Sequence, residues 1–119
     1  MTRTHATSDI TMTRTLEIAN TIKSQIVAQS PAALMSYAAR DFVALSETNK
    51  RHGGLQFKVS GYKHKGLVLI NLAFNDTYTV EAVKIRKGSV TICNVLKDVY
   101  ADQLIKVLDS FVEGVEYAR

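Results

Sequence analysis

Asp76, Glu81 and Lys84 are the residue types with which metal-dependent nucleases hold a divalent cation and position a reacting water. Such sites need the glutamate and the lysine two residues apart on one strand, so that both side chains project to the same side. Glu81 and Lys84 are three residues apart, which places them on opposite faces of a strand. The spacing therefore argues against nuclease chemistry.

Gly61 and Gly66 have the outer spacing of a phosphate-binding P-loop. A P-loop continues with a lysine and then a serine or threonine, but Gly66 is followed by Leu67. The apolar run that begins there predicts a strand, where a P-loop needs a helix. This segment is therefore interpreted as a turn between two strands.

The three histidines, His5, His52 and His64, lie in a tail, a loop and a turn, without the paired spacing of metal ligands. We expect each to be solvated. Cys93, the sole cysteine, stands among apolar residues of a strand, so we expect a buried, inert thiol rather than a reactive one. No nucleophile with a partner base is found, and we expect no enzyme activity, no metal and no cofactor.

The basic turn at residues 62–65, which contains one aromatic residue, remains as the candidate functional feature. Such a turn can meet an anionic partner through its lysines and stack its aromatic ring, and it can equally be a solubilising turn. Further basic residues close the third predicted strand and enter the next turn. The candidate partner-binding residues are Tyr62, Lys63, His64, Lys65, Lys84, Arg86 and Lys87.

Charge is distributed unevenly over the 119 residues, whose formal net charge is +4. Residues 1–51 carry +2, residues 52–97 carry +5 and residues 98–119 carry −3. A basic central region beside an acidic C-terminal segment is consistent with attraction within one fold. It is also consistent with a surface for an anionic partner.

The composition, with 46% hydrophobic and 22% charged residues, is that of one folded domain. No apolar run approaches the ~20 residues that a membrane span needs, and the N-terminal segment lacks the apolar core of a signal peptide. We therefore expect a cytoplasmic protein that does not insert into a membrane, as a monomer or a small homo-oligomer.

The segment from Gly54 to Leu96 predicts an antiparallel meander. β-branched and aromatic residues alternate with turn residues such as Asn75-Asp76 and Lys87-Gly88, which tolerate the backbone angles of tight turns. The predicted strands are 55–60, 67–74, 77–86 and 89–96.

Helices are predicted on both sides of the meander. Thr13 or Thr15 begins a first helix that ends near Gln29, and its apolar face is expected to contain Leu16, Ala19, Ile22 and Ile26, widened by Ile18 and Val27.

Ser30-Pro31 begins a second helix. Residues 41–45 are compatible with an extension of this helix, which we favour, or with a short strand.

Asp98 is expected to cap a C-terminal helix from Val99 to Tyr117. Its apolar stripe is Leu104, Val107, Leu108, Phe111, Val112 and Val115.

The expected organisation is a flexible tail at 1–12 followed by a single α+β domain at 13–119. Its element order is α-α-β-β-β-β-α, a two-layer sandwich in which helices cover one face of an antiparallel sheet.

The sequence resembles a group of small uncharacterised proteins of bacteriophages, prophages and other mobile elements. Two short sequence motifs account for most of the resemblance, Asn75-Asp76-Thr77-Tyr78 and Val99-Tyr100-x-Asp102-Gln103-Leu104. Weaker parallels lie in the first two predicted helices, so the resemblance covers about residues 15–112. It implies a setting, infection or lysogeny, and no catalytic or binding residue.

Proteins of this kind without enzyme motifs act by binding. The sequence favours an accessory protein that binds a host protein or nucleoprotein complex, for example an anti-defence or anti-CRISPR-type inhibitor. The alternative is a nucleic-acid-binding module that uses the basic sheet and hairpin surface.

Overall fold

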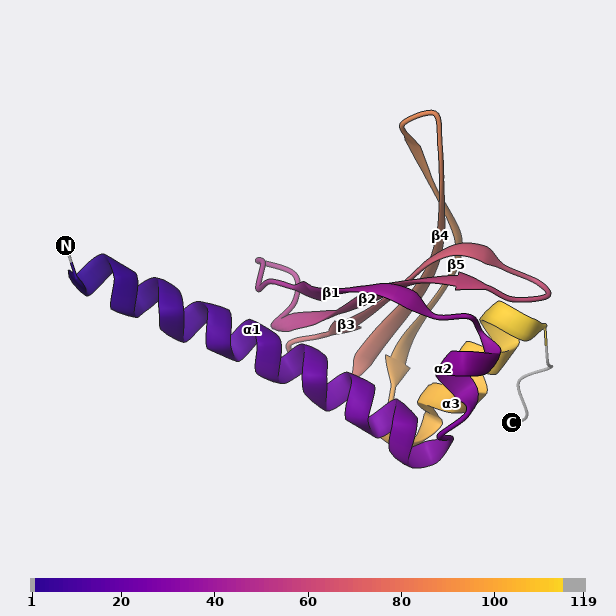
Figure 1. Cartoon of the computed structure of the whole chain (residues 1–119), viewed down its shortest axis with the longest axis horizontal. Helices are drawn as coiled ribbons and strands as arrows, with labels where there is room; N and C mark the ends of the chain where they lie inside the picture. The colour runs from indigo at the N-terminus through magenta and orange to yellow at the C-terminus, as the bar shows by residue number, and fades with distance from the viewer. Residues whose placement is uncertain (1, 115–119) are drawn as a thin grey trace.

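A five-stranded antiparallel sheet with its strands in chain order forms the body of the protein (Figure 1). The computed structural model describes residues 2–114, and side chains from residue 12 onward. The strands are β1 (Arg40–Leu45), β2 (Gly53–Ser60), β3 (Lys65–Leu72), β4 (Tyr78–Arg86) and β5 (Ser89–Val99). The predicted α+β class, the meander and its turns are confirmed.

The helices lie on one face of this sheet (Figure 1). They are α1 (Thr2–Gln29), α2 (Ala33–Ser36) and α3 (Leu104–Leu108), with a 3-10 turn, η1 (Ala101–Gln103), before α3 and a π turn, η2 (Asp109–Glu113), after it. No described helix covers the other face, which we call the open face.

Residues 41–45 form a strand, so the favoured extension of the second helix was wrong. The helix α2 has a single turn, because Ala38 takes a left-handed backbone conformation with φ of 53° and ends the helical path. The chain then enters β1, where the Phe42 ring packs against Phe57 with ring centroids 5.3 Å apart. The strand uses apolar residues whose spacing also suits a helix.

The first helix begins at Thr2, earlier than the predicted start at Thr13 or Thr15. The segment predicted as a flexible tail, 1–12, is therefore helical from Thr2, while Met1 lies outside the described residues. Ala19, Ile22 and Ile26 are buried as predicted, whereas Leu16 and Val27 are exposed. The apolar face is narrower than predicted because Leu16 and Val27 point away from the core, toward solvent.

The C-terminal helix begins after Tyr100, so the predicted cap at Asp98 was wrong. Asp98 still belongs to β5, with φ of 57°, and the Tyr100 N–H donates to Gln103 Oε1 at 3.0 Å. The helical segment ends at Gly114, whose φ of 80° is left-handed. Leu104, Val107, Leu108, Phe111 and Val112 are buried as predicted. Val115 and Tyr117 lie outside the described residues.

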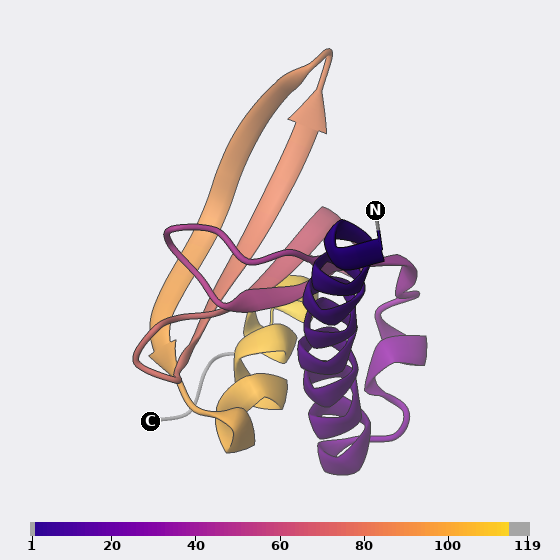
Figure 2. The same ribbon diagram turned by 90° about the vertical axis from the view of Figure 1, so that its left-hand side faces the viewer.

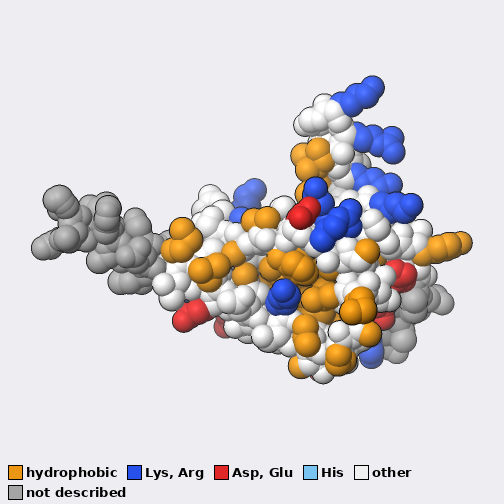
Figure 3. Space-filling model, viewed as in Figure 1, with side chains coloured by type: hydrophobic (Ala, Val, Ile, Leu, Met, Phe, Trp, Pro, Cys, Tyr) orange, Lys and Arg blue, Asp and Glu red, His pale blue; other side chains and the backbone are white. Residues whose placement is uncertain are grey.

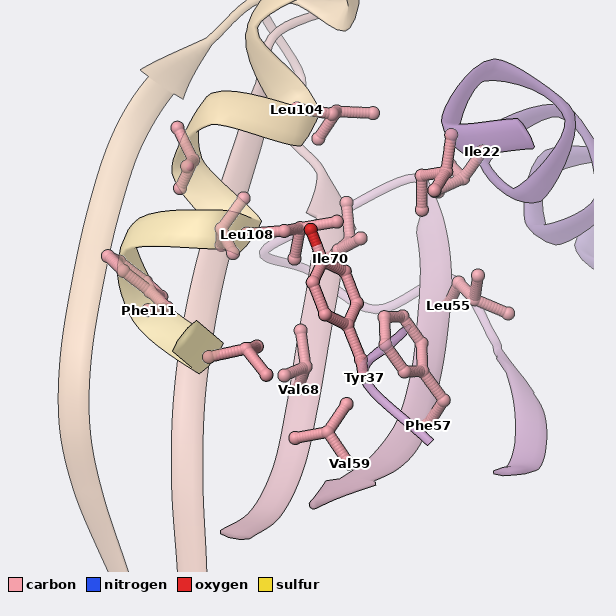
Figure 4. Close-up of a cluster of buried hydrophobic side chains, with 14 of the residues drawn as sticks. Ile22, Tyr37, Leu55, Phe57, Val59, Val68, Ile70, Leu104, Leu108 and Phe111 are labelled. Atoms are coloured by element: carbon pink, nitrogen blue, oxygen red, sulfur yellow. The ribbon is translucent and has the colours of Figure 1, made fainter. Parts of the chain in front are cut away.

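The core lies between the helices and the sheet (Figure 4). Phe57, Val68 and Ile70 point from the strands toward Leu104 and Leu108 of α3, and Ile22 joins them from α1. Two buried tyrosine hydroxyls tie these elements together. Tyr78 of β4 donates to Gln25 Oε1 of α1 at 2.7 Å and so joins the sheet to the helices, whereas Tyr37, at the end of α2, donates to Asp109 and joins two helical segments. Burial, and then the contact with Asp109, raises the pKa of Tyr37 well above its ordinary value.

Leu108→Ala should lower the free energy of unfolding by about 2–5 kcal/mol, because Leu108 is fully buried between α3 and the sheet. Leu16→Ala, at an exposed position, should cost less than about 0.5 kcal/mol. Urea unfolding followed by circular dichroism measures both. Equal losses in the two variants would contradict the assigned core.

Tyr37→Phe should flatten the loss of stability at alkaline pH. Burial raises the pKa of Tyr37 above its ordinary 10.0 in the folded protein, so above pH 10 the unfolded chain releases this proton first. Stability therefore falls as pH rises, by up to about 1.4 kcal/mol per unit for this group.

Unfolding midpoints measured from pH 8 to 11 compare wild type with the variant. Burial also raises the pKa of Tyr78, so the variant should keep a shallower decline. Identical slopes would contradict a protonated, buried Tyr37.

Candidate binding surface on the projecting hairpin

Most of the predicted partner-binding residues lie at one end of the sheet. The antiparallel register pairs Ser60 with Lys65 and Arg86 with Ser89, so the β2–β3 turn and the β4–β5 turn project from the same end. Figure 3 shows lysine and arginine side chains, in blue, along the projecting hairpin and near its base. The structure thus places at one end of the sheet two turns that are about 20 residues apart in the sequence, although they project in different directions (Figure 1).

The β2–β3 turn is held by the C-terminal helical segment. The N–H groups of Lys63 and His64 both donate to the Val112 carbonyl, at 2.9 and 3.1 Å. A Cβ atom at Gly61 would lie 2.3 Å from the Val112 side chain, so this close approach requires glycine. The turn therefore presents its side chains from a fixed backbone.

Side chains of this turn differ in accessibility. Tyr62 is 93% exposed, and Lys63 and Lys65 are also exposed, whereas His64 is 3% exposed. The His64 ring folds back beneath the turn, with Nε2 3.1 Å from the Leu67 carbonyl oxygen. The expectation of a solvated His64 was wrong, and its ring supports the turn rather than facing a partner.

The other histidines give different outcomes. His52 is half-buried, and its ring meets Phe74 edge-on with centroids 4.7 Å apart, so it is not the solvated residue expected. The side chain of His5 lies outside the described residues.

The β4–β5 hairpin extends past the rest of the sheet (Figures 1 and 2). Pairing of β3 with β4 ends at Leu67 and Val83, while β4 and β5 continue to pair up to Arg86 and Ser89. Lys87 and Gly88, with φ of 49° and 82°, form the two-residue left-handed turn that suits a twisted hairpin. We call residues 84–92 the ribbon.

The two sides of the ribbon differ in chemistry. Lys84 and Arg86 alternate with Ile85, so they share the side of buried Ala82, while Ile85 shares the side of Val83. Ile85, Val90 and Ile92 are 56%, 64% and 57% exposed. Val90 pairs with Ile85 and Ile92 with Val83, so one side is aliphatic and the other is basic.

The aliphatic side of the ribbon continues onto the open face of the sheet. Leu67 and Leu69 of β3 and Val95 of β5 lie in register with Val83 and Glu81 of β4, and each is at least partly exposed. Lys58 and Lys65 lie on the same face, and Lys58 Nζ is 3.4 Å from an Asp41 carboxylate oxygen. The open face is thus apolar along its middle, with lysines at the end that carries the ribbon.

Sequence reasoning found the basic residues but missed this apolar surface. The available signal was strand length. The predicted strands 77–86 and 89–96 are long enough to pair with each other beyond the point where the predicted strand 67–74 begins. Residues past that point have no neighbouring strand, so their aliphatic side chains are exposed.

Cys93 is exposed, so the expected buried thiol was wrong. The register of β4 and β5 shifts between Ala82 and Val83, and Cys93 is the extra residue of this bulge on an edge strand. Its Sγ lies 4.0 Å from the Thr91 carbonyl oxygen.

The described residues contain no group of three or more His, Cys, Asp or Glu side chains placed to hold a metal ion. Within the same residues, no helix has the length and apolar character to cross a membrane.

Comparison with protein families, with curated proteins and with solved structures finds no match.

In the folded protein, Cys93 should react fully with a thiol-specific reagent such as DTNB, because its side chain is exposed on an edge strand. Absorbance of the released thiolate gives one equivalent without denaturant, and Cys93→Ser gives none. A thiol that reacts only after unfolding would contradict the exposed bulge.

Proposed function

We propose that this protein is a non-enzymatic binding protein that docks onto an acidic surface of a host protein or nucleoprotein complex. The observation that supports this most is the ribbon, which projects from the sheet with Ile85, Val90 and Ile92 on one side and Lys84 and Arg86 on the other. The resemblance to proteins of phages and other mobile elements supports the setting.

Exposed aliphatic side chains favour a protein partner. Their burial contributes about 25 cal/mol per Å² of apolar area, and the buried centres of protein interfaces are apolar. Phosphate groups would use only the basic side of the ribbon. A partner with an apolar patch bordered by carboxylates would use both sides.

The basic side contributes to association rate and to choice of partner. Lys84, Arg86 and Lys87 are close together on a two-stranded arm, and Lys65 lies at the start of the neighbouring β3. Such a concentration of charge attracts acidic surfaces over distance and opposes binding to basic ones. The protein would then act by occupying a surface that the host complex needs.

A nucleic-acid partner is the second candidate, and the shape of the ribbon favours it. A two-stranded antiparallel ribbon can enter the major groove of B-DNA, which is about 12 Å wide. Lys84, Arg86 and Lys87 would then contact phosphates, and exposed Tyr62 could stack on an unpaired base.

The two sides of the ribbon can be tested separately in a quantitative pull-down from host cells. One variant combines Lys84→Glu with Arg86→Glu, and a second combines Ile85→Ser with Ile92→Ser. The matched charge control is Arg14→Glu with Lys106→Glu, two exposed basic residues away from the ribbon. If a protein partner binds both sides of the ribbon, each ribbon variant should bind it at least about tenfold more weakly, about 1.4 kcal/mol. The control should bind it as the wild type does. Partners that both ribbon variants retain would contradict the proposal.

Binding to random-sequence duplex DNA and to single-stranded RNA tests the second candidate. Contacts with several phosphates on duplex DNA give a slope of log affinity against log salt near −0.9 per contact. Lys84→Glu with Arg86→Glu should reduce that slope, while Ile85→Ser with Ile92→Ser should not. Salt-dependent binding that only the charge variant weakens would replace the protein-partner proposal.

A further inference from the structure

A polar pocket opens on the open face at the end of the sheet opposite the ribbon. Its volume is about 710 Å³, within the range of small-molecule sites. Its lining comes from the loop before β2, the β3–β4 turn and the open-face side chains of β3, β4 and β5. The pocket shares no residue with the ribbon.

Arg51, Asn71 and Glu81 form a line across this pocket. Arg51 Nη1 donates to Asn71 Oδ1 at 3.0 Å, and Asn71 Nδ2 donates to Glu81 Oε2 at 3.4 Å. Asn71 is 8% exposed, so the central amide is held in the sheet between a cation and an anion. The two charged groups are thereby kept apart by a neutral group instead of pairing directly.

Each charged group keeps one unused polar atom. The guanidinium of Arg51 is fixed at two positions, because Nε also donates to the Ser46 carbonyl oxygen at 3.0 Å. Among the described residues, Arg51 Nη2 and Glu81 Oε1 have no hydrogen-bond partner in the structure. A guanidinium oriented in this way is suited to a carboxylate, and the free carboxylate oxygen is suited to an ammonium group.

The remainder of the lining suits a small polar ligand. Lys50 and Lys97 add positive charge at the rim, and Thr79 contributes a hydroxyl. Asp98 also lines the pocket, but its carboxylate accepts from Asn75 Nδ2 at 3.4 Å. Phe74, an exposed ring at the rim, can cover the short apolar part of a ligand.

We propose that this pocket binds a small zwitterion, a molecule with a carboxylate and an ammonium group on a short chain. The carboxylate pairs with Arg51 and Lys97, and the ammonium group pairs with Glu81. A zwitterion pairs with both Arg51 and Glu81. A molecule with only one of the two charged groups leaves either Arg51 or Glu81 unpaired. The site therefore discriminates by the presence of both charges.

The test is a titration of the full-length ¹⁵N-labelled protein, followed by amide NMR shifts. The probes are glycine, β-alanine and 4-aminobutyrate, which separate the two charges by increasing distances, with acetate and methylammonium as single-charge controls. At least one zwitterion should shift the Asn71 side-chain amide and the backbone amides of residues 50–52 and 79–81. Its affinity should be at least about tenfold higher than that of either control.

Glu81→Gln is the first decisive variant, since a glutamine can still accept from Asn71 while losing the charge. It should reduce the preference for the zwitterion over acetate to near unity, and Arg51→Gln should abolish binding of both. Lys58→Gln, on the same face outside the pocket, is the matched control and should change nothing. Thermal unfolding checks that each variant folds.

Three results would overturn the proposal. The first is the absence of any amide shift with a zwitterion at about 10 mM, a concentration well above a millimolar dissociation constant. The second is an affinity for acetate equal to that for the zwitterion. The third is a preference for the zwitterion over acetate that Glu81→Gln leaves unchanged. Because the ribbon lies at the other end of the sheet, the ribbon variants should bind the probes normally. Failure here is therefore distinguishable from failure of the proposed function.

Discussion

Packing of helices against a single face of the sheet determines every other feature of this protein. Phe57, Val68 and Ile70 are fully buried beneath α1 and α3, and this contact supplies the main apolar burial of the fold. A hydrogen bond from Tyr78 of β4 to Gln25 of α1 reinforces this packing, and a bond from Tyr37 to Asp109 holds two of the helical segments together. The opposite face of the same strands receives no described helix, so its side chains are available for other contacts.

The same packing also positions the features at the two ends of the open face. The Val112 carbonyl, at the end of the helical segment, accepts the N–H groups of Lys63 and His64 and fixes the turn at the ribbon end. At the other end, Asn71 projects from β3 between Arg51 and Glu81 and organises a polar pocket. A rigid two-layer body thus presents an apolar and basic arm at one end and a mixed-charge pocket at the other.

Local patterns predicted most of the sheet from the sequence, because turn residues such as Lys87-Gly88 have strong backbone preferences. The same patterns failed where tertiary contacts decide. Phe42 belongs to a strand because it packs on Phe57, a contact between residues 15 positions apart that no local window contains. Cys93 and Ile92 have apolar surroundings in the sequence but are exposed, because Cys93 is the extra residue of a bulge and Ile92 projects from the open face, which no described helix covers.

The residue types of the candidate site were predictable from the sequence, whereas the exposure of its side chains depends on tertiary contacts. Lys84, Arg86 and Lys87 stand out by residue type, whereas the exposure of Ile85 depends on how far β3 extends beside β4. His64 looked like a turn residue in solvent, and its burial follows from contacts with Leu67 and Val112 that bring distant segments together. The Arg51–Asn71–Glu81 line joins the loop before β2 to β3 and β4 and has no signature in the sequence.

Contact between the ribbon and a macromolecular partner can be detected in living cells. The most direct measurement places a photo-crosslinking amino acid at Ile85 of the protein expressed in host cells, with Met35, an exposed residue of α2, as the matched control. We expect a specific protein adduct from position 85, competed by the unlabelled wild-type chain, and none from position 35. No adduct at position 85, or the same adduct from both positions, would contradict this expectation.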